Sequence, residues 1–265
     1  MSSQLIYDRP AQDRKEEDVI VSFFETVPHV LPPSVPDVPD LSGQEPTIGS
    51  LVDRQQFWIR LANTPERRET ANVLIDRMYA WRGYDRNSLG NENPQRVTLI
   101  AYGMDNQAIG TITVGMDSPD GLLADENYHA EVDSLRARGR TICEFNGLAI
   151  DSCVKSKRVI ASLFHIAMLY PWGMFGYTDA VIEVTPRHAK FYERMLGFTP
   201  LGPERICPRV NVAGVLMHLD FSHSDAKITK VGGLMENGKN DRSLYPYFFT
   251  KTDADGILGR LRRMA

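Results

Sequence analysis

The spacing of hydrophobic and polar residues divides the chain into regular segments from about residue 60 onward. A helix is predicted over 64–82, because Thr64-Pro65 is a typical helix start and apolar residues then recur at helical spacing. The remaining patterns predict strands at 97–102, 109–115, 141–150, 180–185 and 213–221 and helices at 122–138, 154–170 and 187–196. Antiparallel strands come first, and a strand–helix–strand unit with parallel strands follows. This order predicts an α+β fold with a mixed sheet.

Residues 1–50 differ from the rest of the chain. Six prolines fall between Pro28 and Pro46 without apolar periodicity, which predicts an extended or partly disordered arm. An arm that wraps around the domain is the alternative. The remaining sequence is divided into a main domain, 51–221, and a C-terminal extension, 222–265, which contains an aromatic cluster at 245–249.

Composition narrows the possible functions. The net charge of −4 argues against broad nucleic-acid binding, which needs a concentrated basic surface. The three cysteines fit neither a metal site nor an even disulfide framework, and this favours a reducing compartment. There is no apolar signal core and no run of about 18 apolar residues, so we expect a cytoplasmic protein. Three arginines near the C-terminus, at 260, 262 and 263, support contact with an anionic membrane only weakly.

Residues 180–198, AVIEVTPRHAKFYERMLGF, form the most informative segment. This strand, the Pro-Arg-His break and the helix that follows resemble the last conserved unit of the N-acetyltransferase (GNAT) superfamily. The resemblance implies a GNAT-like acyl-CoA N-acyltransferase fold with a splayed parallel strand pair. It also implies that Tyr192 lies near a thioester sulfur and protonates the departing thiolate, a role that suits a phenol. The alternative is that Tyr192 packs its ring and hydrogen-bonds at a surface.

The strand at 141–150 contains a carboxylate among apolar residues. Alternation places five side chains on one face: Ile142, Glu144, Asn146, Leu148 and Ile150. A carboxylate in such a setting is usually paired, protonated or functional. We predict that Glu144 accepts the proton that an attacking ammonium group must lose. The alternative is a structural ion pair with an arginine nearby in sequence (Arg136, Arg138 or Arg140).

Asn146-Gly147 interrupts the same strand. A glycine inside a strand often marks a β-bulge, whereas Asn-Gly also favours a hairpin turn. We favour the bulge, because residues 148–150 continue in phase with Ile142. In the GNAT superfamily this strand splays from its parallel neighbour and admits a pantetheine arm. The backbone N–H of Leu148 is then predicted to stabilise the thioester oxygen as it gains charge.

The segment after this strand, 151–158, lacks glycine. Most coenzyme A-dependent members of the superfamily bind the pyrophosphate here with backbone N–H groups of a glycine-containing loop. This chain instead offers the side-chain charges of Lys155, Lys157 and Arg158. Such a site suits the single phosphate and acidic helix of an acyl carrier protein better than the whole coenzyme. A solvated basic turn is the alternative.

Several segments in order resemble the long-chain N-acyl amino acid synthases, relatives of the acyl-homoserine-lactone synthases. They are RMYAWRGY (77–84), GTITVGMDSPDGL (110–122), SLRARGRTICEFNGLAID (134–151), RHAKFYERMLGF (187–198) and RSLYPYFF (242–249). The resemblance implies transfer of a long acyl chain from acyl carrier protein to the amino group of an amino acid or similar amine, without a permanently bound cofactor. Gly147 stands where the lactone synthases carry arginine, and this departure weakens the case for a homoserine-lactone product.

The resemblance also suggests which residues bind substrate. Trp81, Arg82 and Tyr84 fall where these families carry residues that close over the reaction site. The full substrate-binding set is Trp81, Arg82, Tyr84, Asn146, Arg187 and His188. Arg82 is predicted to hold a substrate carboxylate and Trp81 to cover the acyl group. Core packing of Trp81 and a solvated helix end at Arg82 are the alternatives.

Two further groups of residues have the composition of possible sites. The candidates for lining an acyl tunnel are Met168, Trp172, Met174 and Phe175, which core packing explains equally well. No metal site is expected, because alternation along the last strand separates His218, Asp220 and His223. Two other functions stay open: coenzyme A-dependent N-acetylation of a small-molecule or protein amine, and a non-catalytic module that binds acyl carrier or lipid.

Overall fold

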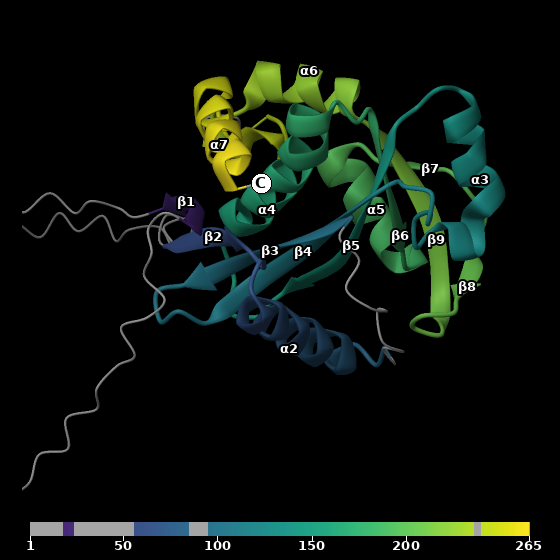
Figure 1. The fold of residues 1–265 in the computed structure, drawn as a ribbon, viewed down its shortest axis with the longest axis horizontal. Helices are drawn as coiled ribbons and strands as arrows, with labels where there is room; N and C mark the ends of the chain where they lie inside the picture. The colour runs from purple at the N-terminus through teal and green to yellow at the C-terminus, as the bar shows by residue number, and fades with distance from the viewer. Residues whose placement is uncertain (1–17, 24–55, 85–94, 236–239, 265) are drawn as a thin grey trace, which may run out of the picture.

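The computed structural model describes residues 18–23, 56–84, 95–235 and 240–264. Four of the strands come before residue 117 with one long helix between them, and the described helices are more frequent toward the C-terminus (Figure 1). The strands are β1 (Val19–Phe23), β2 (Phe57–Leu61), β3 (Arg96–Gly103), β4 (Ala108–Met116), β5 (Ile142–Ile150), β6 (Asp179–Val184), β7 (Thr199–Pro200), β8 (Arg205–Cys207) and β9 (Val212–Asp220). The α-helices are α2 (Pro65–Trp81), α3 (Asp125–Ala137), α4 (Lys157–Met168), α5 (Pro186–Leu196), α6 (Phe221–Val231) and α7 (Lys251–Met264). A π-helical turn, η2 (Leu169–Gly173), follows α4, and a 3-10 turn, η4 (Tyr245–Tyr247), precedes α7.

One mixed sheet organises the molecule, with strand order β1-β2-β3-β4-β5-β6-β9-β7, and β8 pairs with β9. Among the described strands only β5 and β6 run parallel to each other. The predicted α+β fold with a mixed sheet and one parallel pair is therefore confirmed. The reason is the connection between these two strands, since parallel neighbours need a crossover and α4 provides it.

Helices cover both faces of the sheet. On one face, α2 packs Leu74, Ile75 and Met78 against Ala149 of β5, and α3 lies farther along the same face. On the other face, α4 is covered in turn by α6, α7 and the segment that leads to α7 (Figure 1). This double cover explains why α4 is buried almost all round, from Val159 to Met168.

The predicted helices and strands are confirmed within a few residues at their ends. Thr64 caps α2, since its hydroxyl accepts the Arg67 N–H at 3.3 Å, and Gly197 ends α5 in the left-handed conformation (φ 80°). Four short strands and one helix were missed, namely β1, β2, β7, β8 and α6. Asp18 and β1 lie inside the predicted N-terminal arm, while the rest of the arm falls outside the described residues. None of the described helices combines the length and apolar character that crossing a membrane requires.

The strand pair at the centre of the sheet parts toward one end. β5 and β6 are in register only from Ile142/Asp179 to Glu144/Val181, although β5 continues to Ile150. The predicted β-bulge in β5 is confirmed: Thr111 pairs with Ala149 and Thr113 with Asn146, so β5 contains one extra residue there. Gly147 adopts a φ of +57° at this position, which favours glycine.

The bulge also corrects one prediction about faces. Ile142 packs with α3 on one side of the sheet, whereas Leu148 and Ile150 pack against the core on the α4 side. The expectation that Leu148 and Ile150 share a face with Ile142 and Glu144 is therefore wrong. The physical reason is that side chains of a strand alternate between two faces, and one inserted residue shifts this alternation by one position. Each side chain beyond Gly147 therefore points to the face opposite to the one that uninterrupted alternation predicts.

Candidate active site

A cavity of about 360 Å³ occupies the opening between β5 and β6. One wall is the end of β5, from Glu144 to Ile150, and the other is the end of β6 with Thr185 after it. Ile182 belongs to the core on the α4 side, and by alternation its neighbour Glu183 points to the α3 side. Both residues line the cavity, which therefore passes through the sheet.

Glu144 lies in this cavity and is only 2% exposed. Its Oε2 accepts hydrogen bonds from the backbone N–H groups of Leu123 (2.7 Å) and Ala124 (3.3 Å). No described residue donates a hydrogen bond to Oε1. Burial raises the pKa of Glu144 to about 7, and the charge of Arg209 and the two amides counteract this effect only in part. The group is thus able to gain and lose a proton near neutral pH.

The alternative ion pairs for Glu144 are not formed. Arg136 binds Asp117, Asp125 and Asp133, Arg140 binds Asp179 and Asp220, and Arg138 donates to the Ser134 carbonyl. The contacts of Arg136 instead anchor the connection between β4 and α3, which supplies the two amides to Glu144. Arg136 therefore acts on Glu144 through the loop and not by direct pairing.

Tyr192 lines the same cavity from α5. Its ring contacts Phe164 and Phe198 edge-on, with centroids 6.2 and 6.0 Å apart. No described residue hydrogen-bonds its hydroxyl group. Burial raises the pKa of Tyr192 well above its ordinary value, so the phenol keeps its proton at neutral pH. A protonated phenol in the cavity is available as a donor.

The end of α2 meets the start of α5 at the cavity. Arg187 Nη2 donates to the Tyr84 hydroxyl at 2.8 Å, and its guanidinium lies 5.8 Å from the Tyr84 ring centroid. His188 lines the cavity beside them, with Nδ1 3.0 Å from Thr185 Oγ1, and burial lowers its pKa. Tyr84 lines the cavity as well, so the contact joins α2 and α5 across one side of it.

Arg82 lines the cavity and pairs with no carboxylate of the described residues. Its Nη1 donates to the Met78 carbonyl at 2.9 Å, and its guanidinium lies 5.4 Å from the Trp81 ring centroid. Trp81 is 74% exposed and does not line the cavity, so its alternative placement in the core is wrong. Trp81 is the last residue of α2, and the described residues leave its side chain exposed to solvent.

The bulge residues contribute to the cavity wall. Asn146, Gly147 and Leu148 all line it, and the Gly147 carbonyl accepts the Thr111 hydroxyl at 2.8 Å. Neither Gly147 nor Leu148 has a partner in the β4 register, and pairing with β6 has already ended at Glu144. Asn146 Nδ2 is buried without a hydrogen-bond partner among the described residues. The bulge therefore directs backbone and amide groups at the space between the strands.

The comparison with known proteins agrees with this geometry. The family model of "N-acyl amino acid synthase FeeM" matches residues 70–220, more than half of the chain. The chain belongs to this family. The structure of FeeM, an N-acyl amino acid synthase from uncultured soil microbes, superposes with a TM-score of 0.59 and 24% sequence identity, covering 65% of this chain and 94% of that one. No curated protein matches the chain.

Other solved structures are more distant. An acyl-CoA N-acyltransferase from Pseudomonas aeruginosa has a TM-score of 0.44 at 12% identity, covering 62% of this chain and 98% of that one. The AHL synthase LasI has a TM-score of 0.43 at 10% identity, with coverages of 63% and 90%. Membership of the FeeM family makes the chain an N-acyltransferase.

The basic turn lies where α4 begins beside the cavity. Ser156 caps the helix by accepting the Arg158 N–H at 3.1 Å, and Ile160, one turn further on, lines the cavity. Lys155 and Lys157 form no ion pair with the described residues. Lys157 and Arg158 lie over aromatic rings, at 5.5 Å from Tyr247 and 4.6 Å from Phe23. This FeeM-family chain thus carries positive side chains at the helix start.

The predicted tunnel residues lie away from this cavity. None of them lines it: Met168, Trp172, Met174 and Phe175. α4 begins at the cavity, and the η2 turn that follows its far end packs against α6 and α7. There Trp172 contacts Phe221 (6.2 Å between ring centroids), and Gly173 lies against Leu258. Phe175 is half exposed. These four residues therefore lie outside this cavity, whose apolar lining comes from Leu148, Ile150, Ile160, Ile182, Val184 and Phe191.

The cavity residues that the sequence did not predict include Glu183, Arg209 and Tyr79. Glu183 on β6 and Arg209 in the turn between β8 and β9 form an ion pair. Nothing in the local sequence of Arg209 marks it, since its partners lie more than 25 residues away. Tyr79, in contrast, precedes Arg82 by three residues on α2, and helical spacing would have identified it.

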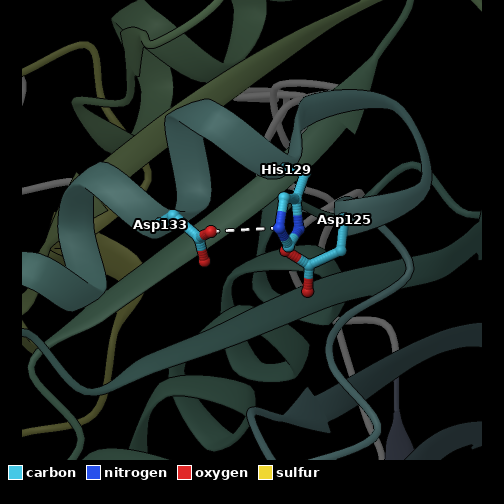
Figure 2. Close-up of side chains that lie close together, drawn as sticks. All are labelled: Asp125, His129 and Asp133. Carbon is cyan, nitrogen blue, oxygen red and sulfur yellow. Dashed lines mark ion pairs between the residues drawn. The ribbon is translucent and has the colours of Figure 1, made fainter.

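One group of potential metal ligands occurs among the described residues, on α3 and outside the cavity. His129 lies between Asp125 and Asp133, with Nε2 3.0 Å from Asp133 Oδ2 (Figure 2). Arg136 binds both carboxylates, at 2.6 and 2.8 Å. The cluster therefore serves to hold the β4–α3 connection. Of the residues considered earlier, His218 bonds Asp179 at 2.5 Å, and Asp220 pairs with Arg140.

Proposed function

We propose that this chain transfers a long-chain fatty acyl group from acyl carrier protein to the amino group of an amino acid or similar amine. The observation that carries the proposal is one cavity with a titrating carboxyl group and a protonated phenol in its lining, Glu144 and Tyr192. Acyl transfer to an amine needs a proton acceptor for the ammonium group and a proton donor for the thiolate, and these two groups fit those roles.

The reaction begins with the acceptor bound as an ammonium ion. Glu144 takes one proton through Oε1, the oxygen that the loop amides leave unoccupied. The free amine then attacks the thioester carbonyl, a C–N bond forms, and the oxygen gains negative charge. The Leu148 N–H at the bulge is the candidate donor to this oxygen. When the C–S bond breaks, Tyr192 gives its proton to the thiolate, and the second proton that the nitrogen loses as the amide forms restores the phenol, directly or through solvent.

Arg82 is the candidate for the carboxylate of an amino acid acceptor. It is a cation in the cavity lining that no described carboxylate neutralises. Arginine binds carboxylates with two parallel hydrogen bonds, which fixes the orientation of the bound molecule. Asn146, whose buried Nδ2 has no partner in the described part of the chain, and His188 are the neighbouring polar groups that would contact the acceptor.

The donor is proposed to be acyl carrier protein, and no permanently bound cofactor is needed because the donor brings its own phosphopantetheine. The Ser156 cap occupies an N–H at the start of α4 that a pyrophosphate would otherwise use. Lys155, Lys157 and Arg158 offer positive charge at the same place, and they suit the acidic surface of a carrier protein. The apolar wall of the cavity supports a fatty acyl group.

The test is a matrix of donors and acceptors read by mass spectrometry. Acyl carrier protein loaded with a long acyl chain, the matching acyl coenzyme A, and acetyl coenzyme A are each incubated with free amino acids and with simple amines. We expect an amide from the carrier-bound long chain and an amino acid. Efficient turnover of acetyl coenzyme A with simple amines instead would contradict the proposal.

Variants sharpen the same experiment. Arg82→Gln should raise the KM for an amino acid by about 10-fold or more and leave the KM for a simple amine unchanged, because only the amino acid has a carboxylate. Arg138→Gln is the control, since Arg138 is exposed and its side chain bonds, among the described residues, only the Ser134 carbonyl one turn earlier. An equal loss with both kinds of acceptor would remove Arg82 from the carboxylate site.

A further inference from the structure

Arg209 connects several elements behind the cavity. Nη1 donates to the Leu123 carbonyl at 2.7 Å and pairs with Glu126 of α3 at 2.8 Å, while Nη2 pairs with Glu183 of β6. The side chain is 14% exposed and lines the cavity. Arg209 therefore joins the β8–β9 turn, β6, α3 and the β4–α3 connection through one guanidinium group.

Leu123 connects this arginine to Glu144. The carbonyl of Leu123 is held by Arg209, and the N–H of the same residue donates to Glu144 Oε2 at 2.7 Å. A movement of Arg209 would therefore displace the shorter of the two hydrogen bonds that fix the carboxylate. Oε1 would then lose its orientation toward the cavity.

We propose that Arg209 is a positioning residue for Glu144: it fixes the Leu123 backbone, and its positive charge favours the ionised form of the carboxylate. This inference rests on the proposed role of Glu144 as the proton acceptor. Without Arg209, a carboxyl group that is 2% exposed would remain protonated at neutral pH and would not accept a proton from the amine.

Other charged groups act on Glu144 from the surrounding elements. Arg96 on β3 is a second cation that favours its ionised form. Glu126 and Glu183 pair with Arg209 and so reduce its effect, and Cys143 adjoins Glu144 on β5. Burial is the largest influence on the pKa of Glu144 and raises it, and Arg209 is the largest influence in the opposite direction.

Arg205 provides a matched control in the same hairpin. It also joins the hairpin to α3, by a paired contact with Glu131 (2.7 and 3.0 Å) and a hydrogen bond to the Asn127 carbonyl (2.6 Å). It does not line the cavity and has no contact with the Leu123 backbone. Arg205→Gln thus removes an equivalent structural link and leaves the surroundings of Glu144 intact.

The experiment measures the titration of Glu144 directly by carbon-13 NMR of labelled glutamate carboxyl groups, without substrate. Glu144→Gln identifies the signal by its loss. In Arg209→Gln we expect the midpoint of the Glu144 titration to rise by about 1 pH unit, and in Arg205→Gln we expect no shift. The acid limb of kcat/KM should move with the NMR midpoint in each variant, and activity of Arg209→Gln should recover as the pH rises.

Arg209→Met, which preserves the volume of the side-chain stem, is the second variant if Arg209→Gln does not fold, with the same shift expected. An unchanged midpoint in the folded Arg209 variant, or an equal shift in Arg205→Gln, would overturn the inference. The NMR titration needs no turnover, so it decides the role of Arg209 even if the donor and acceptor proposed above are wrong. If the titration shifts but the kinetic limb does not, Glu144 is not the proton acceptor.

Discussion

At the scale of single residues, Glu144 shows a conflict between stability and chemistry. A carboxylate that accepts only two backbone hydrogen bonds and is almost fully buried costs free energy whenever it is ionised. The folded protein therefore binds the Glu144 proton more tightly than the unfolded chain does, with a pKa of about 7 against an ordinary value of 4.5. The same shift is what makes the group useful as a base at neutral pH.

This conflict predicts a change in stability on substitution. Because the folded pKa is raised, Glu144 lowers stability as the pH increases from about 4.5 to about 7, and the full cost is present above that range. Glu144→Gln should therefore have a higher Tm than the wild type at about pH 8, and the difference should disappear toward about pH 4. Thermal unfolding at both pH values measures it.

Glu131→Gln is the control for this measurement. Arg205 lowers the pKa of Glu131 by hydrogen bonding, which is the opposite direction. Removing that carboxylate should not raise the Tm at about pH 8. If Glu144→Gln were less stable than the wild type at this pH, the contacts of ionised Glu144 would outweigh the cost of burying its charge. That result would refute the raised pKa.

At the scale of elements, one inserted residue in β5 creates the site. The bulge at Gly147 interrupts the pairing with β4 at that residue and reverses the faces of the residues after it, and it lies three residues beyond the point, Glu144, where the pairing with β6 ends. A side chain at Gly147 would meet Thr113 Oγ1 at 3.0 Å and Ile75 at 3.4 Å, in addition to the strain of a φ of +57°. The glycine thus lets β4 and α2 approach the bulge closely.

Gly147→Ala should consequently lower both stability and turnover. We expect a loss of about 2 kcal/mol in the free energy of unfolding, from positive φ and crowding together, and a larger proportional loss in kcat because the bulge changes shape. Gly139→Ala is the matched control, with a φ of +74° and no atom within 4 Å of the added carbon. It should lose about 1 kcal/mol and keep its kcat. Equal effects on kcat would show that the bulge geometry is not required.

The sequence predicts those elements whose signals are local. The helix start at Thr64-Pro65 and the helix end at Gly197 are marked by residue types that occur at those positions in many helices. The bulge at Asn146-Gly147 is marked by a glycine inside a strand. β2 (FWIRL) was missed because almost all of its side chains are buried and no alternation remains, and β7 and β8 are too short for periodicity. The sequence predicts the candidate site only in part. Glu144, Tyr192 and Arg82 belong to segments that resemble a known family, whereas Arg209 lines the cavity next to residues that are distant from it in sequence.

At the scale of the whole molecule, the C-terminal segment completes the core on the α4 side. His165 of α4 accepts the Phe249 N–H at 2.9 Å, and its ring stacks on Phe248 and Phe249 at 4.7 and 5.2 Å. Phe249 also stacks on Phe23 of β1, so residues from both ends of the described chain meet beside α4. α4 carries the basic turn at its start, and this packing holds the turn relative to the cavity.

Burial lowers the pKa of His165 to about 3, which predicts sensitivity to acid. The unfolded chain binds this proton from about pH 6.5 downward and the folded chain does not, so His165 lowers stability progressively as the pH falls from about 6.5 to about 3. His165→Asn keeps an acceptor for the Phe249 N–H and removes the titration. The fall in Tm over that range should be smaller in the variant than in the wild type. Parallel pH profiles would contradict the buried, neutral state of His165.

The central claim is that acyl transfer takes place between β5 and β6 with Glu144 as the proton acceptor. The most direct measurement is the pH dependence of kcat/KM for amide formation in the wild type and in Glu144→Gln. The wild type should lose activity on the acid side of a midpoint near 7, the pKa of the buried carboxyl group. The variant should be slower by about 10²-fold and lack that limb. A variant with the wild-type rate and the same limb would contradict the account.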